Sequence, residues 1–232
     1  MLLSTKARWK LHEFARVSFI LLVLCISSAS QLAKPLQSEA DTVVQQLREL
    51  PTPLPPSPRS DGSTPPEEQR RRQLYERLFH LGANGVLALS GALSDNDVRL
   101  RKNAALALNV LAGGWYDLSW PKLDIKPALP ALIAALQDGD VNVRAWSAQA
   151  IGDIGPDAAK AVPDLITLLS NPNEGSRNSA CIALRNIGPA AKQALPILRK
   201  SLSDPSKDVR RFAALAIESI ERWHFLAAPP NR

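Results

Sequence analysis

Two stretches of this sequence are near copies of one another, IGDIGPDAAKAVPDL (residues 151–165) and LRNIGPAAKQALPIL (residues 184–198). Ile154, Gly155 and Pro156 of the first align with Ile187, Gly188 and Pro189 of the second, at an offset of 33 in the numbering. Glycines that precede a helix can bind phosphate, whereas a glycine followed by proline stops a helix. The number of copies and their place relative to the helices therefore decide what these stretches do.

The same offset recurs along the C-terminal half of the chain. Equivalent positions are occupied by Pro130, Pro163 and Pro196, by Arg144, Arg177 and Arg210, and by Ile151, Leu184 and Ile217. An earlier copy lies upstream at a longer offset, with an insertion between Leu111 and Pro130. The sequence therefore predicts four units, at about 83–112, 126–156, 159–189 and 192–222.

Each unit contains two helical patterns. The first is short, as in ALPALIAAL (residues 128–136), and has proline near its N-terminal end, where the missing N–H is not needed. The second is longer and apolar along a broad face. Residues that can cap a helix N-terminus separate the two: Asp97, Asp140, Asn173 and Ser206. One such hairpin cannot bury its apolar face alone, so we expect an all-α fold, an α-α superhelix (solenoid) of four stacked hairpins.

This arrangement answers the question of the glycines. Gly155 and Gly188 follow the second helix of a unit and do not precede a phosphate-binding helix. We expect each to adopt a left-handed conformation that stops the helix, with the following proline preventing its continuation.

The second helices also resemble a known family. LRKNAALALNVL, VRAWSAQAIGDIGP, SRNSACIALRNIGP and VRRFAALAIESI are similar to HEAT repeats of the short kind associated with phycobilin lyases. The resemblance covers roughly residues 83–222 and implies an α-superhelical scaffold. It does not by itself imply lyase activity.

The segment 1–30 has the layout of a secretory signal peptide. A basic segment precedes the apolar run VSFILLVLCI (residues 17–26), which small residues follow. This run is shorter than the roughly 20 residues that span a bilayer, so export to a periplasmic or secreted location is favoured over an uncleaved membrane anchor. Cys181 would then be the single cysteine of the mature chain and could form no internal disulfide.

Residues 31–66 are expected to form a short helix and a linker. Apolar residues recur at helical spacing up to Leu50, and the proline-rich stretch PTPLPPSPRSDGSTPP (residues 51–66) follows. Residues 67–232 are expected to form the HEAT-like repeat domain, with a capping helix at each end.

The sequence favours no enzymatic chemistry. Histidine occurs only at positions 12, 80 and 224, and there is no HExxH, CxxC or P-loop pattern. We therefore predict no catalytic, cofactor-binding or metal site. Without the segment 1–30 the formal charge is +3, which is too small to favour a nucleic-acid partner.

Two recurring positions are given structural roles. The arginine column at 101, 144, 177 and 210 recurs with acidic or amide residues at 95, 138, 171 and 204, which predicts a ladder of ion pairs between units. A stripe that binds anions is the alternative. Cys181 takes the place of Ala148 and Ala214, so it is expected in the core.

Candidate partner-binding residues lie where the units differ. On the second helices, three columns are expected on the concave face: Asn103, Trp146, Ser179 and Phe212; Leu106, Gln149, Ile182 and Leu215; and Asn109, Gly152, Arg185 and Glu218. Aromatic residues beside an arginine are typical of binding hot spots, although the two rings could instead fill gaps between helices. The insertion GGWYDLSWPKLD (residues 113–124) adds Trp115, Tyr116 and Trp120, which either bind a partner or seal the side of the stack.

The sequence thus supports a non-enzymatic scaffold that is exported and binds a protein or peptide partner. A bilin lyase-like subunit that acts on a chromophore-bearing protein is the alternative, because the family resemblance permits it.

Overall fold

The computed structural model describes residues 35–51, 65–113 and 122–226, without the side chains from residue 222 onward. The chain divides into two compact units, Met1–Glu39 and Ala40–Arg232. Only residues 35–39 of the first unit are described, so all contacts below belong to the second.

The described regular structure is entirely helical. A helix over residues 35–48 is followed by α2 (Pro66–His80) and then by pairs of helices. The pairs are α3 (Ala83–Ala92) with α4 (Val98–Leu111), α5 (Leu129–Ala135) with α6 (Val141–Ile154), α7 (Val162–Leu168) with α8 (Glu174–Ile187), and α9 (Leu195–Ser201) with α10 (Lys207–Leu226). Short 3-10 helices, η1 (Lys126–Ala128), η2 (Gly155–Ala161) and η3 (Gly188–Ala194), precede the last three pairs. The four predicted hairpins and the all-α solenoid are therefore confirmed.

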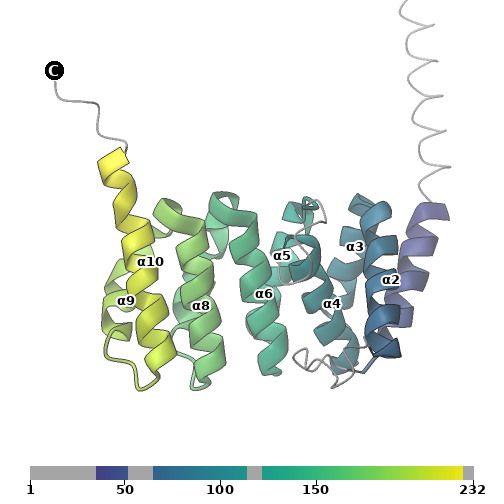
Figure 1. Ribbon diagram of the computed structural model, residues 1–232, viewed down its shortest axis with the longest axis horizontal. Coiled ribbons are helices and arrows are strands. Elements are labelled where there is room, and N and C mark those ends of the chain that lie inside the picture. Colours follow the sequence, from purple (N-terminus) through teal and green to yellow (C-terminus); the bar gives the residue numbers. More distant parts are fainter. Residues whose placement is uncertain (1–34, 52–64, 114–121, 227–232) are drawn as a thin grey trace, which may run out of the picture. The chain divides into compact units, whose positions relative to one another are not determined.

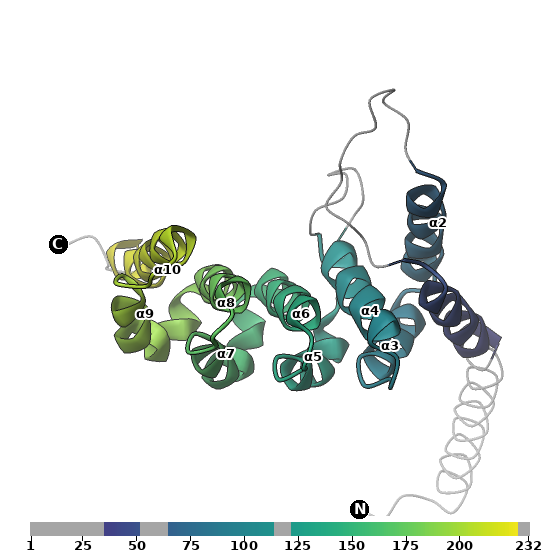
Figure 2. The same cartoon turned by 90° about the horizontal axis from the view of Figure 1, so that it is seen from below.

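The paired helices form two layers. Figure 2 shows α3, α5, α7 and α9 in one row and α4, α6, α8 and α10 in the other. In Figure 1 the second helices follow one another side by side in chain order. Each second helix packs on the next, so the core runs continuously between the layers through fully buried residues such as Leu108, Ile151 and Leu184.

The ends of the helices follow the predicted signals. Asp97, Asp140 and Asn173 accept backbone N–H groups of the helices that they precede. Gly155 and Gly188 end α6 and α8 with φ of 75° and 66° and ψ of −143° and −136°. The predicted positive φ is therefore confirmed, but ψ lies outside the left-handed helical range. This combination of φ and ψ is essentially restricted to glycine.

A buried polar cluster holds the N-terminal helix on the first repeat. Asn103 of α4 is fully buried, accepts a hydrogen bond from Arg71 Nη1 at 2.7 Å, and donates to the backbone oxygen of Leu47 at 2.8 Å. Arg71 of α2 is 1% exposed and donates from Nη2 to the backbone oxygen of Pro51 at 2.6 Å. The two side chains thus satisfy carbonyl groups at the C-terminal end of the helix over residues 35–48.

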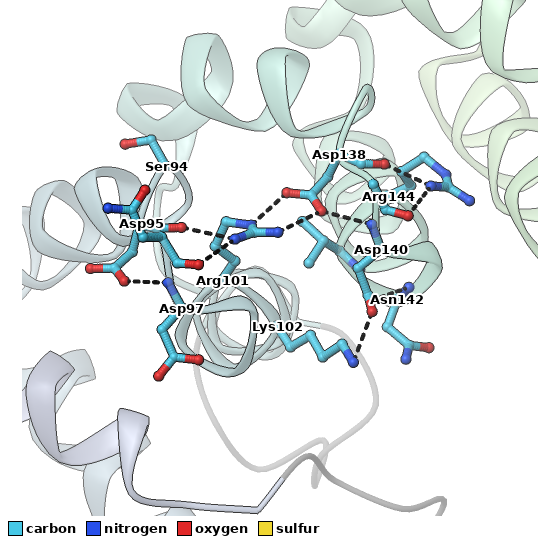
Figure 3. A network of polar contacts seen from close by, with 12 residues as sticks. Ser94, Asp95, Asp97, Arg101, Lys102, Asp138, Asp140, Asn142 and Arg144 are labelled. Atoms are coloured by element: carbon cyan, nitrogen blue, oxygen red, sulfur yellow. Dashed lines mark hydrogen bonds and ion pairs between the residues drawn. The ribbon is translucent and has the colours of Figure 1, made fainter.

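The arginine column forms the predicted ion pairs at two of its four positions, of which Figure 3 shows the first. Arg101 donates from Nε and Nη2 to the carboxylate of Asp138 in the next unit, at 2.7 and 3.2 Å. Its Nη1 donates to the backbone oxygens of Asp95 and Asn96 in its own turn. Asp138 also accepts the backbone N–H of Asp140, so the same carboxylate shapes its own turn and binds the neighbouring unit.

The contacts between other units differ in the side chain that the arginine binds. Arg177 binds Asp204 with both Nε and Nη2 at 2.8 Å, and Arg48 of the N-terminal helix supplies an additional rung to Asp95 at 2.7 Å. Asn171 occupies the position equivalent to Asp138 and Asp204, so Arg144 has no carboxylate there. Arg144 Nε donates to Ser176 Oγ at 3.1 Å instead. Carboxylates of neighbouring units therefore bind two of the four column arginines, Arg101 and Arg177, and all four donate to backbone oxygens of their own turn, which favours a structural role over a stripe that binds anions.

Cys181 is fully buried on α8, and burial raises the pKa of its thiol to about 12. Its predicted place in the core is confirmed. Within the described ranges, none of the helices combines the length and the apolar composition that a membrane span requires.

Candidate partner-binding surface

The second helices of units two to four present a mixed surface, here called the second-helix face. It consists of the predicted column residues that retain exposure: Trp146, Gln149, Ile182, Arg185, Phe212, Leu215 and Glu218. They come from α6, α8 and α10, which pack side by side in that order (Figure 1). Apolar, aromatic and charged groups are therefore available on one rigid surface.

The two aromatic residues of the second-helix face are half-buried. Trp146 and Phe212 pack against the hydrophobic core with part of each ring and leave the rest accessible. The guanidinium carbon of Arg211 lies 5.2 Å from the centroid of the Phe212 ring. Each ring thus fills space between helices and also offers apolar surface to a partner, so the two interpretations of these residues are compatible.

Arg185 lies between the two aromatic positions along the row, on α8. Its side chain is half-buried, and its Nε lies 3.4 Å from Asn186 Oδ1. Its backbone oxygen accepts a hydrogen bond from Ser219 Oγ of α10 at 2.9 Å, which ties the two helices together here. The main chain at Arg185 is therefore fixed, while the guanidinium can still contact another molecule.

The first unit contributes less to this surface than the sequence predicts. Asn103, expected in the same column as Trp146, is fully buried under the N-terminal helices. Asn109 is 2% exposed and donates from Nδ2 to Asp153 Oδ2 of α6 at 3.2 Å. Among the described residues, nothing donates to its buried Oδ1. Asn109 therefore orients Asp153 and offers almost no surface of its own.

Asp153 is an ionisable residue that the sequence reasoning did not single out. It lies in the last turn of α6, beside Gly152, and burial raises the pKa of its carboxyl group to about 6, while the charge of Lys122 opposes this rise. A carboxylate is disfavoured in the last turn of a helix, because the helix dipole is negative there. The sequence shows a carboxylate in this unfavourable position, but the burial that raises its pKa arises only from tertiary packing, which includes the contact with Asn109 of α4.

Gly152 brings α6 and α8 together beside Asp153. A Cβ atom added at Gly152 would lie 2.9 Å from Ala183 Cα and 3.3 Å from Asn186 Nδ2. The glycine is therefore required by the close approach of the two helices at this end of the second-helix face.

The aromatic insertion cannot be placed on this surface. Trp115, Tyr116 and Trp120 lie outside the described residues, and their role stays a prediction. The two ends of the insertion are held close together, since the N–H of Leu123 donates to the backbone oxygen of Leu111 at 2.8 Å. The side chain of Lys122 packs against Gly113.

A shallow groove lies on the other layer, between α3 and α5. Its lining includes small residues such as Ser90, Ala131 and Ala134, together with the charged residues Asp95, Arg101 and Asp138. These two residues bind each other, and Arg48 binds Asp95, which also lines the groove. The charged groups of the groove thus belong to the ladder and leave the second-helix face as the better candidate for binding.

Comparison with known proteins agrees with this architecture. Residues 129–219 match the family model described as HEAT repeats. No curated protein matches the sequence.

Solved structures share the fold. The complex of CpcE and CpcF of phycocyanin lyase from Nostoc sp. PCC7120 is similar at 18% identity with a TM-score of 0.58, over 77% of this chain and 98% of that chain. Computationally designed armadillo repeat proteins for modular peptide recognition are similar at 26% identity with a TM-score of 0.52, over 63% and 68%. A designed armadillo repeat protein in complex with the peptide (KR)4 is similar at 20% identity with a TM-score of 0.54, over 78% and 81%.

The resemblance to HEAT repeats is thus confirmed: residues 129–219 match these repeats in sequence, and the described solenoid has the fold of HEAT and armadillo-type repeat proteins.

Proposed function

We propose that this protein is an exported, non-enzymatic scaffold that binds a protein or peptide partner through its second-helix face and the insertion at residues 113–124. The observation that carries the proposal is the pair of half-buried rings, Trp146 on α6 and Phe212 on α10, with Arg185 on the intervening helix α8. Rigid aromatic anchors next to an arginine are the residue types that dominate binding energy at protein interfaces.

The fold supports a partner of this class. Stacked helical hairpins offer an extended and rigid surface, and two of the similar structures are designed for peptide recognition or bind a peptide. Basic residues (Arg185 and Arg211) and acidic residues (Asp153 and Glu218) both lie on or next to this surface. A partner of mixed charge therefore fits better than a polyanion.

The test is a comparison of matched variants in a pull-down from the envelope or secreted fraction. The double variant Trp146→Ala/Phe212→Ala should lose the partner by about tenfold or more. Leu87→Ala is the control, because Leu87 is 52% exposed on α3 in the other layer. Equal recovery of a partner by both variants, with circular dichroism showing both folded, would exclude the second-helix face.

The insertion needs its own experiment. If it binds, replacing Trp115 and Trp120 with alanine should weaken partner affinity while the melting temperature stays unchanged. If the two tryptophans seal the side of the stack, the same replacement lowers both the melting temperature and the affinity.

Export is tested at the native N-terminus. Mass spectrometry of the protein from its own cells should find a chain that begins near Gln31. A chain that retains residues 1–30 in the membrane fraction would instead support the uncleaved anchor.

A bilin lyase-like role is the second candidate. The similarity to the CpcE–CpcF complex, which covers 98% of that chain, favours it. Mixing the protein with free bilin should then change the absorbance spectrum of the bilin, and an unchanged spectrum would exclude this role.

A further inference from the structure

The last repeat exposes an apolar position that every other repeat buries. Leu202 follows α9 and is 43% exposed. The equivalent leucines, Leu93, Leu136 and Leu169, are 5%, 0% and 4% exposed, and each of them has a following unit packed against it. Among the described residues, no further unit packs against Leu202. A terminal repeat that ends in water normally has a polar outer surface, so this exposure points to a site for another molecule.

Ala214 on α10 is a second position that is exposed only in the last repeat. Its equivalents Ala105, Ala148 and Cys181 are fully buried on α4, α6 and α8, whereas Ala214 is exposed. A small residue at such a position lets a neighbouring helix approach closely. The outer side of α10, which ends the row in Figure 1, is therefore shaped for packing against another helix.

Arg210 has the geometry of a ladder arginine without its carboxylate. Its Nη1 donates to the backbone oxygens of Asp204 and Pro205 at 2.7 and 2.9 Å. In the preceding repeat, Arg177 Nη1 donates in the same way to the backbone oxygens of Asn171 and Pro172. In Arg177 the Nε and Nη2 groups bind Asp204. In the part of the chain that the structure describes, the same two groups of Arg210 have no hydrogen-bond partner.

Charge along α10 is self-complementary. The residues at helical spacing around Ala214 form the α10 outer stripe: Lys207, Arg210, Arg211, Ala214, Ile217, Glu218 and Glu221. Its N-terminal half is basic and its C-terminal half is acidic. Arg210 and Glu218 lie four residues on either side of Ala214, and Lys207 and Glu221 lie seven on either side. Asp208 falls on a different side of the helix.

We propose that a second copy of this chain docks on the α10 outer stripe, so that two α10 helices cross antiparallel about a two-fold axis at Ala214. This arrangement brings Arg210 near Glu218 of the other copy and Lys207 near Glu221, and it covers Leu202. Such an interface is isologous, which closes the assembly at two copies. Head-to-tail stacking is not available, because the N-terminal helices already cover the first unit and Arg48 already binds Asp95.

The oligomeric state of the full-length chain tests the proposal. Sedimentation equilibrium should give a dimer that dissociates as NaCl is added, since the opposed charges lie at the protein surface. Ala214→Arg should produce a monomer with unchanged circular dichroism. Ala134→Arg, which changes an exposed alanine of α5 in the other layer, should remain a dimer.

Two variants, each with an α10 outer stripe of mainly one charge sign, test the antiparallel arrangement. Lys207→Glu/Arg211→Glu gives an acidic stripe, and Glu218→Lys/Glu221→Lys gives a basic one; Arg210 is kept because it holds its own turn. Arg199 binds Glu221 in the wild type at 2.8 Å, and that surface contact is lost in the second variant. Each variant alone should be a monomer, and an equimolar mixture should form a heterodimer.

Three results would overturn the proposal. The first is a wild-type chain that stays a monomer at high micromolar concentration. The second is a dimer that Ala214→Arg leaves intact, because its interface would lie elsewhere. The third is a mixture of the two charge variants that fails to associate although the wild type does.

Discussion

Arg177 and Asp204 join the third repeat to the fourth through two hydrogen bonds of 2.8 Å, donated by Nε and Nη2 of the guanidinium group. Their side chains are only 14% and 10% exposed, so water screens the pair less than it screens a surface ion pair. Hydrogen bonding to Arg177 holds the pKa of the Asp204 carboxyl below its usual value. This junction is thus held by a largely buried ion pair as well as by apolar packing, as is the junction at which Arg101 binds Asp138.

Arg177→Ala should lower the free energy of unfolding by about 2 kcal/mol, because it removes a bidentate charged contact and leaves backbone oxygens of its turn without a donor. Arg144→Ala is the matched control and should cost about 1 kcal/mol, since Arg144, at the equivalent interface between the second and third repeats, reaches only the hydroxyl of Ser176. Urea unfolding of both variants measures the difference. Partner affinity should stay at the wild-type value, and a loss of affinity without a loss of stability would contradict the structural role of the ladder.

Asp153 should make stability depend on pH near neutrality. Because burial raises its folded-state pKa from 3.8 to about 6, the native protein binds this proton more tightly than the unfolded chain does. The free energy of unfolding should therefore fall as the pH rises from about 4 to about 6, by about 1–2 kcal/mol because solvent screens this partly exposed carboxyl group, and change little above that range through this group.

Asp153→Asn removes this titration and should be more stable than the wild type at pH 7 but not at pH 4. Asp157→Asn is the control, because Asp157 is 61% exposed and pairs with Lys126 at the surface. Thermal unfolding across this pH range compares the three proteins. A parallel pH dependence in wild type and Asp153→Asn would contradict the burial of the Asp153 carboxyl group.

Asn103→Ala should detach the N-terminal helix. The change removes an acceptor from Arg71, a charged group that is 1% exposed, and two donor contacts to the backbone of residues 47 and 50. We expect a loss of about 3 kcal/mol and faster hydrogen exchange of the amides in residues 40–50. Arg70→Ala breaks only an exposed pair with Glu49 and should change stability by less than about 0.5 kcal/mol. If both variants were equally stable, the buried cluster would have no role in holding this helix.

Gly152→Ala should lower stability by about 1–3 kcal/mol, because the new methyl group would meet the backbone of Ala183 on α8. Gly91→Ala on α3 has no atom within 4 Å of the added carbon and should be neutral or stabilising by up to about 1 kcal/mol. Chemical unfolding of the two variants provides the comparison. A neutral Gly152→Ala variant would show that α6 and α8 can separate at this point without cost.

The constant repeat offset, the caps and the glycine stops were sufficient to predict the four hairpins and their stacking. These are local and periodic features: a proline, an N-cap or a stripe of apolar residues acts within one or two helical turns, so it can be read without knowing what lies opposite. The same periodicity identified the arginine ladder. The arginines at 101, 144, 177 and 210 recur with a carboxylate at 95, 138 and 204, and with the amide of Asn171 in the third unit.

Tertiary structure alone decided which members of a periodic column reach the surface. Asn103, Trp146 and Phe212 are equivalent in sequence, but the N-terminal helices bury the first and leave the other two half-exposed. The raised pKa of Asp153 and the exposure of Leu202 likewise depend on what packs against them. Periodicity places a side chain on a face of its own helix, whereas its burial is fixed by the neighbouring element, which can come from a distant part of the chain or be missing at the end of the stack.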